Sequence, residues 1–204
     1  MTKPTFIWDF DGTLVDSYPA ILESLEATYQ HFQIPFDRVA VENYILEKST
    51  GDLLLDLEKN YGVSFEELKK KQSVEQAARD DSIVLMPGAK EVLEWTKQEG
   101  IQNFIYTHKG ATTESVLQRL GISDYFTEVI TSADGFKRKP HSEAIDFLIS
   151  TYGLAPQSTV YIGDRYLDMA LAKIAGIQSL NLNQPSDSSN RKIEHLEEII
   201  SLFS

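Results

Sequence analysis

The segment Pro4–Trp8 constrains the fold more than any other, because it is almost wholly apolar and stops abruptly at two acids. A short apolar run that ends at a turn signal is typical of a strand buried on both faces of a parallel sheet. Asp9 and Asp11 follow at spacing i, i+2, so both side chains are expected to point the same way. Gly12 then permits a sharp turn without a Cβ penalty. Because open α/β sheets bind ligands at the carboxyl ends of their strands, we predict a site here.

Beyond residue 83 the sequence alternates between short apolar runs and amphipathic segments that end at glycine. Strands are expected at about 101–107, 128–132, 159–162 and 177–182, with helices at about 87–99, 115–120, 143–152, 169–175 and 194–203. Strands that alternate with helices predict βαβ units and a parallel sheet. The expected fold class is therefore α/β, a Rossmann-like parallel sheet with helices on both faces.

Residues 16–82 contain helical patterns and no convincing strand. We therefore expect an all-α cap inserted at 16–82, in an α/β catalytic core made of 1–15 and 83–204. Insertions that leave a core beside a site can act as lids. Residues 184–190 are polar and rich in turn formers, which predicts a surface loop.

The charge and composition of the chain exclude several function classes. Its 204 residues carry a net charge of -12, which repels nucleic-acid backbones and anionic lipids. The absence of cysteine excludes disulfides, a cysteine nucleophile and cysteine-ligated zinc. The sequence shows no signal-peptide pattern and no apolar stretch long enough to span a bilayer. We expect a cytoplasmic protein, a monomer or weak homodimer, with neither nucleic acid nor membrane as a partner.

Other predicted strands of the core also end at polar or charged side chains. Thr107 ends one strand, where its hydroxyl can donate to an anionic oxygen or cap a helix. Three consecutive bases follow the next strand, and Pro140 favours an extended conformation at the third of them, Lys139. An extended backbone helps to aim this lysine, which can hold a phosphate or neutralise crowded acids.

Asp164 and Asp168 follow the strand at 159–162. Their spacing of four predicts that both lie on one side of a helix that starts here, where a single acid often serves as a cap. With Asp9 and Asp11 they give four carboxylates at one edge, which repel one another unless cations intervene. Mg²⁺ prefers oxygen ligands of this kind, and no cysteine or histidine cluster competes for a softer metal. We therefore expect Mg²⁺ as the cofactor.

These motifs together resemble those of the haloacid dehalogenase-like superfamily of phosphohydrolases. The matching segments are, in chain order, Asp9–Ser17, Thr107, Lys139-Pro140, and Gly163-Asp164 with Asp168. The helical insert is similar to the small cap of the phosphoglycolate phosphatase-like and β-phosphoglucomutase-like members. The sequence departs from the usual pattern at His108, where members often have Asn, and at Ser142, where they often have Pro. Neither departure removes a catalytic group.

The resemblance implies a Mg²⁺-dependent phosphatase that hydrolyses a small phosphorylated metabolite. Asp9 would be the nucleophile that forms an aspartyl-phosphate, and Asp11 the general acid and base. Asp9, the backbone carbonyl of Asp11 and Asp164 would hold the metal, with Asp168 in support, while Thr107 and Lys139 would take up transition-state charge. The implied substrate-binding residues are Gly12, Thr107, His108 and Lys139, together with Lys48 and Ser49 of the cap. His108 remains open between a substrate contact and a loop residue.

Four other functions remain to be compared with the phosphatase. A true dehalogenase needs no acid for a leaving alkoxide, so Asp11 argues against it. A phosphomutase would keep every core residue and would require a bisphosphate for turnover. A phosphonate hydrolase would need a cap lysine that forms a Schiff base, for which Lys48 is the candidate. A non-catalytic phosphate-binding module would not need both Asp9 and Asp11.

Overall fold

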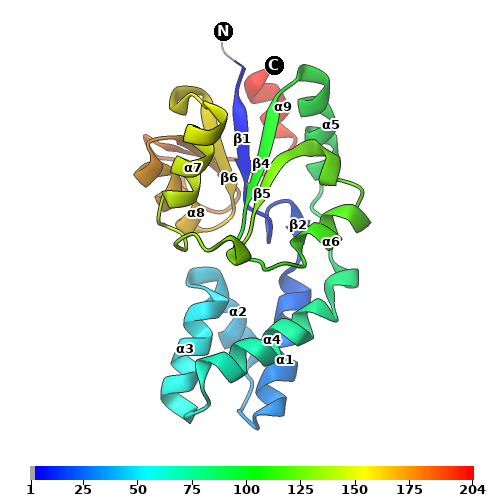
Figure 1. Cartoon of the computed structure of the whole chain (residues 1–204), viewed down its shortest axis with the longest axis vertical. Helices are drawn as coiled ribbons and strands as arrows, with labels where there is room; N and C mark the ends of the chain where they lie inside the picture. Colours follow the sequence, from blue (N-terminus) through cyan, green and yellow to red (C-terminus); the bar gives the residue numbers. More distant parts are fainter. Residues whose placement is uncertain (1–2) are drawn as a thin grey trace. The chain divides into compact units, whose positions relative to one another are not determined.

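The computed structural model describes residues 3–204, and this part of the chain forms two compact units (Figure 1). One unit contains the described residues up to 16 together with 84–204, and the other contains 17–83. The first unit holds a six-stranded sheet, whereas the second is helical. Each unit is therefore described by itself.

All six strands of the large sheet run parallel, in the order β5-β4-β1-β6-β7-β8. Their bounds, in that order, are Phe126–Ile130, Gln102–Tyr106, Thr5–Trp8, Thr159–Gly163, Gln178–Asn181 and Asn190–Lys192. The central strand β1 is buried along its whole length, which accounts for its unbroken apolar run. The parallel α/β sheet expected from the sequence is thereby confirmed.

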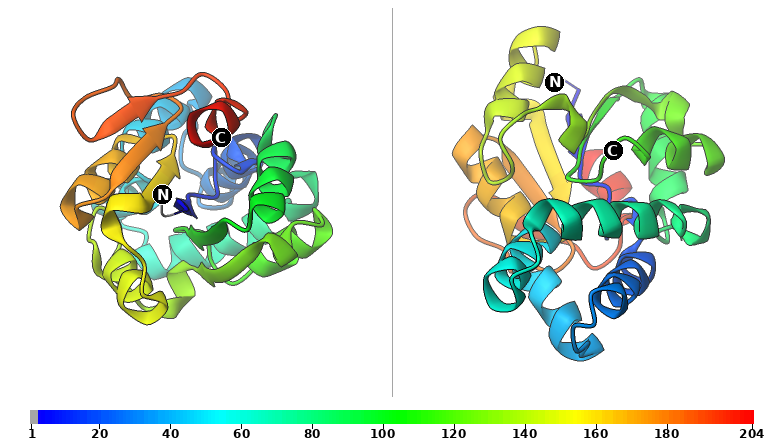
Figure 2. Two further views of the ribbon diagram at one scale, coloured as in Figure 1. Left: turned by 90° about the horizontal axis from the view of Figure 1, so that it is seen from above. Right: turned by 60° about the horizontal axis from the view of Figure 1, so that its bottom comes forward.

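Helices cover both faces of this sheet (Figure 2). Their bounds are Ala89–Glu99 (α5), Thr113–Arg119 (α6), Glu143–Tyr152 (α7), Tyr166–Ala175 (α8) and Glu198–Phe203 (α9). On one face, a buried cluster joins Ile7 of β1 to side chains of α7 and α8. On the other, the ring of Phe6 stacks on Trp95 of α5 and meets Phe203 of α9 edge-on. Neighbouring strand residues point to opposite faces, so β1 contributes to both layers of the core.

Short elements join the larger ones, and one pair of them was missed by the sequence analysis. The 3-10 turns are Ser123–Tyr125 (η2), Ser132–Asp134 (η3) and Pro156–Ser158 (η4). The missed pair is β2, Val15–Asp16, and β3, Val84–Leu85, which form a small antiparallel ladder. These strands flank the helical insert in sequence, so their pairing brings the two chain segments that bound it side by side.

The helical unit has its own core. Its elements are Tyr18–His31 (α1), Arg38–Glu47 (α2), Thr50–Tyr61 (α3), Phe65–Ala77 (α4) and the 3-10 turn Asp80–Ser82 (η1). Asp37, Ser49 and Ser64 begin α2, α3 and α4, and each accepts a hydrogen bond from a backbone N–H of the first turn. Leu25 and Leu68 are fully buried within the unit. No helix within residues 3–204 combines the length and apolar character that a membrane crossing requires.

One expectation near the C-terminus was wrong, and the expected surface loop held for all but its last residue. The closing helix begins at Glu198 rather than at Glu194, because Oε1 of Glu198 accepts hydrogen bonds from the backbone N–H groups of Glu194 and His195 at 2.7 and 2.9 Å. Strand β8 begins at Asn190, at the end of the expected surface loop. The buried Asn190 side chain accepts a hydrogen bond from the hydroxyl of Ser179 at 2.6 Å, which fixes β8 beside β7.

Candidate active site

The carboxyl ends of three neighbouring strands bring distant segments together. β1 lies between β4 and β6, and Trp8 at its end pairs with Ile105 and Ile162 of those strands. The residues just beyond the strands therefore emerge at the same edge. They include Asp9 after β1 and Asp164 after β6.

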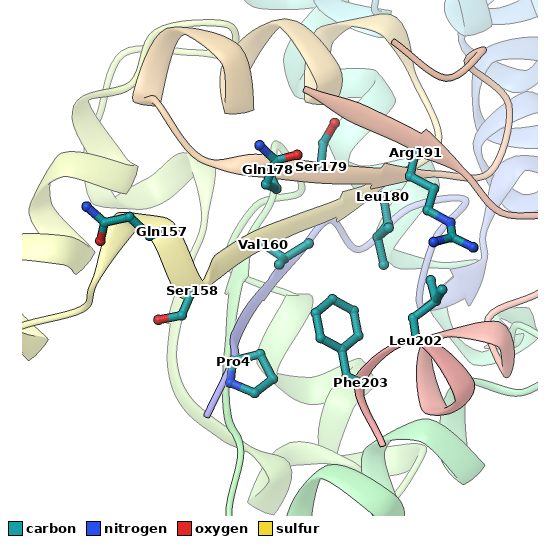
Figure 3. Close-up of a pocket in the computed structure, with 10 residues that line it drawn as sticks. All are labelled: Pro4, Gln157, Ser158, Val160, Gln178, Ser179, Leu180, Arg191, Leu202 and Phe203. Atoms are coloured by element: carbon teal, nitrogen blue, oxygen red, sulfur yellow. The ribbon is translucent and has the colours of Figure 1, made fainter. Parts of the chain in front are cut away.

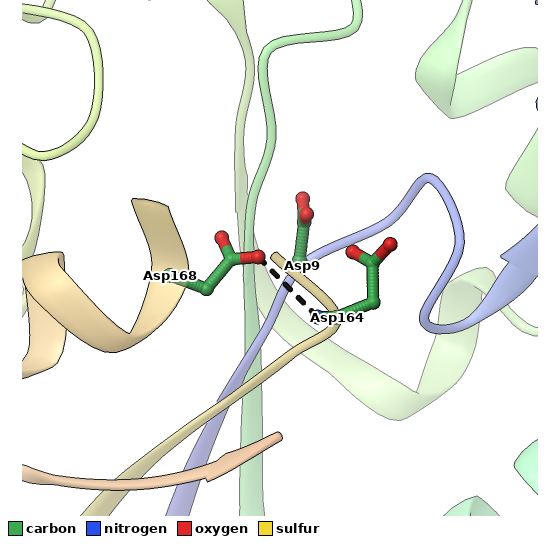
Figure 4. A group of neighbouring side chains, drawn as sticks. All are labelled: Asp9, Asp164 and Asp168. Atoms are coloured by element: carbon green, nitrogen blue, oxygen red, sulfur yellow. Dashed lines mark hydrogen bonds between the residues drawn. The ribbon is translucent and has the colours of Figure 1, made fainter. Parts of the chain in front are cut away.

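Three buried aspartates form the centre of this edge (Figure 4). Asp9, Asp164 and Asp168 each offer one carboxylate oxygen, and these atoms lie within 4.8 Å of one another. The three residues are 1%, 2% and 0% exposed, respectively. The hydroxyl of Thr13 lies 3.4 Å from Oδ1 of Asp164 and donates a hydrogen bond to it. Two segments that are 151 residues apart in sequence therefore share one buried site.

The geometry around Asp168 corrects one expectation. Helix α8 begins at Tyr166, so Asp164 precedes the helix, and the two acids are not on one helical side. Oδ2 of Asp168 accepts the backbone N–H groups of Asp164 and Arg165 at 3.3 and 3.0 Å. These hydrogen bonds hold Arg165 in an extended conformation ahead of the helix. A Cβ on Gly163 would lie 2.4 Å from the Cβ of Asp168, so this close approach requires glycine.

Lys139 joins two of the three acids. Its Nζ lies 2.9 Å from Oδ1 of Asp9 and 2.8 Å from Oδ1 of Asp168, and its side chain is fully buried. The rings of Tyr106 and Tyr161 lie 5.3 and 5.1 Å from the same nitrogen, within cation–π range. Buried charges require such compensation, so Lys139 is held between two carboxylates and two aromatic rings.

The two acids that contact Lys139 have different pKa values. Burial, followed by the charge of Asp168, raises the pKa of Asp9 to about 6, although Lys139 and Arg165 oppose this shift. Burial also acts to raise the pKa of Asp168, but Lys139, Arg165 and the hydrogen bonds outweigh it and lower that pKa. Burial acts to lower the pKa of Lys139, but the charges of Asp168 and Asp9 leave it above its ordinary value. Asp168 and Lys139 are therefore charged, and Asp9 is the group that titrates near neutrality.

The donor atoms at this edge fit a hard divalent cation. Oδ2 of Asp9 and Oδ1 of Asp11 are buried and have no hydrogen-bond partner within residues 3–204. Buried acceptors without a partner are costly, and a bound cation would satisfy the oxygen of Asp9, which belongs to the three-acid group. The oxygens of Asp168 are already engaged by Lys139 and two backbone amides, so this residue is placed to support the ligands. The all-oxygen set of Asp9, Asp11 and Asp164 suits Mg²⁺.

Asp11 lies beside the three-acid group and is not a member of it. Strand β1 ends at Trp8, so the alternation of a strand no longer sets the direction of Asp11. The chain turns here, with Gly12 at a φ of 76° and its N–H donating to the carbonyl of Val15 at 2.9 Å. The glycine expected for a sharp turn therefore occupies one, and the turn gives Asp11 its own position.

Thr107 and His108 follow β4 at the same edge. Thr107 is fully buried, and its hydroxyl accepts a hydrogen bond from the N–H of Lys109 at 3.0 Å. Nε2 of His108 lies 2.9 Å from the backbone nitrogen of Lys139. Burial and the nearby charges of Lys139 and Arg138 lower the pKa of His108, so its ring is neutral. The segment that follows Thr107 and the Lys139-Pro140 segment are therefore in direct contact.

Lys48 and Ser49 belong to the helical unit. Nζ of Lys48 lies 4.7 Å from the ring centroid of Tyr44. The hydroxyl of Ser49 accepts the N–H of Asp52 at 3.1 Å and donates to its carboxylate at 2.6 Å. Both side chains thus contact residues of their own unit, and their role toward a substrate stays a prediction.

Several residues of the site were missed by the sequence analysis. Nη2 of Arg165 lies 3.8 Å from Oδ2 of Asp9, and the arginine side chain is 12% exposed. The side chains of Asn181 and Asn183 donate to the carbonyls of Arg165 and Asp164, each at 3.0 Å. The two asparagines lie at the end of β7, next to β6, so their place among the strand ends was the available signal.

A hollow of about 410 Å³ lies away from these residues, at the opposite edge of the sheet (Figure 3). Pro4, Ser158 and Gln178 line it at the starts of β1, β6 and β7, and Leu202 and Phe203 of α9 form another side. Its lining includes none of the residues predicted for the site. The acids at the carboxyl edge are therefore the candidate active site.

The arrangement of these motifs agrees with a known family. Residues 6–182 match the family model described as haloacid dehalogenase-like hydrolase. The chain belongs to the haloacid dehalogenase-like hydrolases. The resemblance inferred from the motifs is thereby confirmed, and this hydrolase is an enzyme of that family.

Named relatives and a solved structure extend this result. The hydrolase is 31% identical to a phosphoglycolate phosphatase of Nitrosococcus oceani, over 86% of this chain and 81% of that protein. It is 26% identical to the pyrophosphatase PpaX of Oceanobacillus iheyensis, over 88% and 83%. The crystal structure of a predicted phosphoglycolate phosphatase from Haemophilus somnus superposes with a TM-score of 0.86 at 22% identity, covering 100% of both chains. The last comparison establishes the shared fold.

Proposed function

We propose that the protein is a Mg²⁺-dependent phosphatase that hydrolyses a small phosphomonoester through an aspartyl-phosphate on Asp9. The observation that carries this proposal is the state of the Asp9 carboxylate. Oδ1 of Asp9 accepts hydrogen bonds from Lys139 and from the N–H of Phe10, whereas Oδ2 is buried and has no hydrogen-bond partner among residues 3–204. A carboxylate with one oxygen fixed by hydrogen bonds, and the other held only by an ion pair at 3.8 Å with Arg165, is suited to nucleophilic attack.

The proposed reaction has two steps, which split one difficult hydrolysis into two easier ones. In the first, a carboxylate oxygen of Asp9 bonds to phosphorus, the bond to the leaving oxygen breaks, and Asp11 gives its proton to the leaving alkoxide. In the second, Asp11 takes a proton from water as the water oxygen bonds to phosphorus. The bond between Asp9 and phosphorus then breaks, which releases phosphate and regenerates both acids.

The positive charge beside Asp9 complements the negative charge of the transferring phosphoryl group. Lys139 is held in place before the substrate binds, so its charge is preorganised for the transition state. Asp9, Asp164 and the backbone carbonyl of Asp11 would hold Mg²⁺, which would supply charge neutralisation for the phosphoryl oxygens. Thr107 lies at the same edge, and its hydroxyl would donate to one of those oxygens.

The relatives narrow the substrate class. Proteins similar to this one carry the names phosphoglycolate phosphatase and pyrophosphatase. Both names refer to compounds that carry a second anionic group close to the phosphoryl group. Lys139 and Arg165 place two cations within 4 Å of Asp9, which favours a compact, highly anionic substrate. Small anionic phosphoryl compounds are therefore the proposed class.

A panel of phosphoryl compounds tests the proposal. Phosphoglycolate, pyrophosphate, sugar phosphates and nucleoside monophosphates are assayed for phosphate release with Mg²⁺ and with EDTA. Asp9→Asn and Asp11→Asn are expected to lower kcat by orders of magnitude, because each removes a group that acts on the reacting atoms. Asp146→Asn is the matched control, since Asp146 is exposed on α7.

The covalent step has its own readout. Acid-quenched wild-type protein is expected to show the mass of one added phosphoryl group on Asp9, located by peptide mass spectrometry. Unchanged turnover in Asp9→Asn would refute the covalent route. Turnover that requires a sugar bisphosphate and releases no phosphate would identify a phosphomutase instead.

A further inference from the structure

His108 connects two motifs of the site through one partly buried hydrogen bond. Its Nε2 lies 2.9 Å from the backbone nitrogen of Lys139, a residue 31 positions further along the chain. A backbone N–H can only donate, so Nε2 must carry the lone pair, and the proton of the neutral ring lies on Nδ1. Arg138 Nη2 lies 3.2 Å from Nδ1, but this exposed arginine is also only a donor. The shorter contact, to the fixed backbone amide, therefore sets the tautomer.

The segment around Lys139 depends on such anchors. It lies between η3 and α7 and forms no helix or strand. The hydroxyl of Tyr106 donates to the carbonyl of Lys137 at 2.8 Å, two residues before the contact of His108 with Lys139. Tyr106 and His108 both lie at the end of β4, one at its last residue and one just beyond it. The end of β4 therefore holds this segment by two side-chain hydrogen bonds, and the second is at the catalytic lysine itself.

The position of Lys139 leaves little tolerance for backbone movement. Its Nζ makes contacts of 2.9 and 2.8 Å with two different acids, and its side chain is fully buried. By contrast, Lys137 and Arg138 on the same segment are exposed. A shift of about 1 Å in a catalytic group can cost roughly a hundredfold in rate. A hydrogen bond that fixes the backbone of Lys139 therefore also fixes the position of its ammonium group.

We propose that His108 is a positioning residue, whose imidazole accepts the N–H of Lys139 and so holds the lysine ammonium between Asp9 and Asp168. The catalytic part of this inference rests on the proposed phosphatase function. In this proposal His108 contacts the backbone of Lys139, and this role replaces the substrate contact considered from the sequence. The same nitrogen cannot accept the Lys139 amide and contact a phosphoryl group at once.

A matched pair of substitutions separates the hydrogen bond from the volume of the ring. In His108→Gln, the amide oxygen lies three bonds from Cβ, as Nε2 does, so the acceptor is kept. His108→Met has a side chain of nearly the same length and size but lacks a strong acceptor. With the Mg²⁺-loaded enzyme and its best substrate, we expect kcat of the Met variant to fall 10- to 100-fold, while the Gln variant recovers most of it. KM is expected to change less than threefold in both variants.

A double-mutant cycle shows whether His108 acts through Lys139. In the Lys139→Met background, the His108→Met substitution is expected to change kcat less than threefold, because the ammonium to be positioned is gone. A full, additive loss in that background would overturn the proposal. A raised KM with unchanged kcat in His108→Met would also overturn it, since that result indicates a direct substrate contact.

One measurement is independent of activity. Hydrogen exchange of the Lys139 amide, followed by NMR without substrate, is expected to be slow in wild type and His108→Gln, and at least tenfold faster in His108→Met. Equal exchange in all three proteins would overturn the anchor. Fast exchange in the Met variant alone supports it, even if no phosphoryl compound is turned over. A lack of turnover with every phosphoryl compound would count against the proposed phosphatase function and not against the hydrogen bond from Lys139 to His108.

Discussion

Replacing Lys139 by methionine removes the side chain that bridges Asp9 and Asp168. The substitution keeps length and apolar volume but deletes a buried charge with contacts of 2.9 and 2.8 Å. At an effective dielectric constant of about 20, each contact corresponds to roughly 6 kcal/mol of Coulomb energy, from which the cost of burying the ammonium must be subtracted. Breaking a buried ion pair from one side typically costs about 3–5 kcal/mol. The variant is therefore expected to be less stable by about that amount at pH 7.5.

The sign of the pH dependence follows from the same contacts. Without the lysine, the pKa of Asp9 rises further above its unfolded value, and the lowered pKa of Asp168 rises as well. Protonated carboxyl groups need no cation, so the stability lost at pH 7.5 is expected to be regained as the pH falls toward 5. The difference in unfolding free energy between wild type and variant should therefore shrink on acidification.

Urea unfolding in EDTA at pH 7.5 and pH 5, followed by circular dichroism, measures this difference. For a chain of this length, about 3–5 kcal/mol corresponds to a fall in Tm of roughly 6–20 °C at pH 7.5. Lys137→Met is the matched control, because Lys137 lies on the same segment and is exposed. A Lys139 variant as stable as this control, or a cost that is the same at both pH values, would refute the reasoning.

Three further predictions follow from the site. Because the pKa of Asp9 is raised to about 6, the affinity for Mg²⁺ measured by calorimetry should fall about tenfold per pH unit below pH 6, and a flat profile between pH 5 and 7 would contradict this. Gly163→Ala places a Cβ 2.4 Å from the Cβ of Asp168 and should cost about 1–3 kcal/mol in urea unfolding, whereas Gly110→Ala, with its nearest contact at 3.7 Å, should cost less. Because the pKa of His108 is lowered in the folded protein, the His108 ring takes up a proton in the unfolded chain at a higher pH than in the folded one. Below pH 6.5 the free energy of unfolding of wild type should therefore fall, relative to that of His108→Gln, by up to about 1.4 kcal/mol per pH unit. Parallel pH profiles of the two unfolding free energies would contradict this prediction.

Much of the fold was predictable because its signals are local. The apolar run of β1 needed no partner to be recognised, since a short run that is apolar throughout and ends at a turn signal is typical of a strand covered on both faces. Glycines at 100, 153 and 176 end α5, α7 and α8 in the left-handed conformation, which the sequence pattern indicated. The two-residue ladder of β2 and β3 was missed because its strands lie almost 70 residues apart and carry no pattern of their own.

In the candidate site, too, the local features were predictable from the sequence and the long-range contacts were not. The sequence pattern indicated which chemical groups reach the carboxyl edge, because each follows a recognisable strand or precedes a proline, as Asp9 and Lys139 do. The contacts among these groups are visible only in the folded protein: Lys139 lies between Asp9 and Asp168, Arg165 approaches Asp9, and His108 accepts the backbone N–H of Lys139. Contacts of this kind join residues that are distant along the chain. They depend on strand order and on hydrogen-bond partners, and neither of these produces a periodic pattern of residues in the sequence.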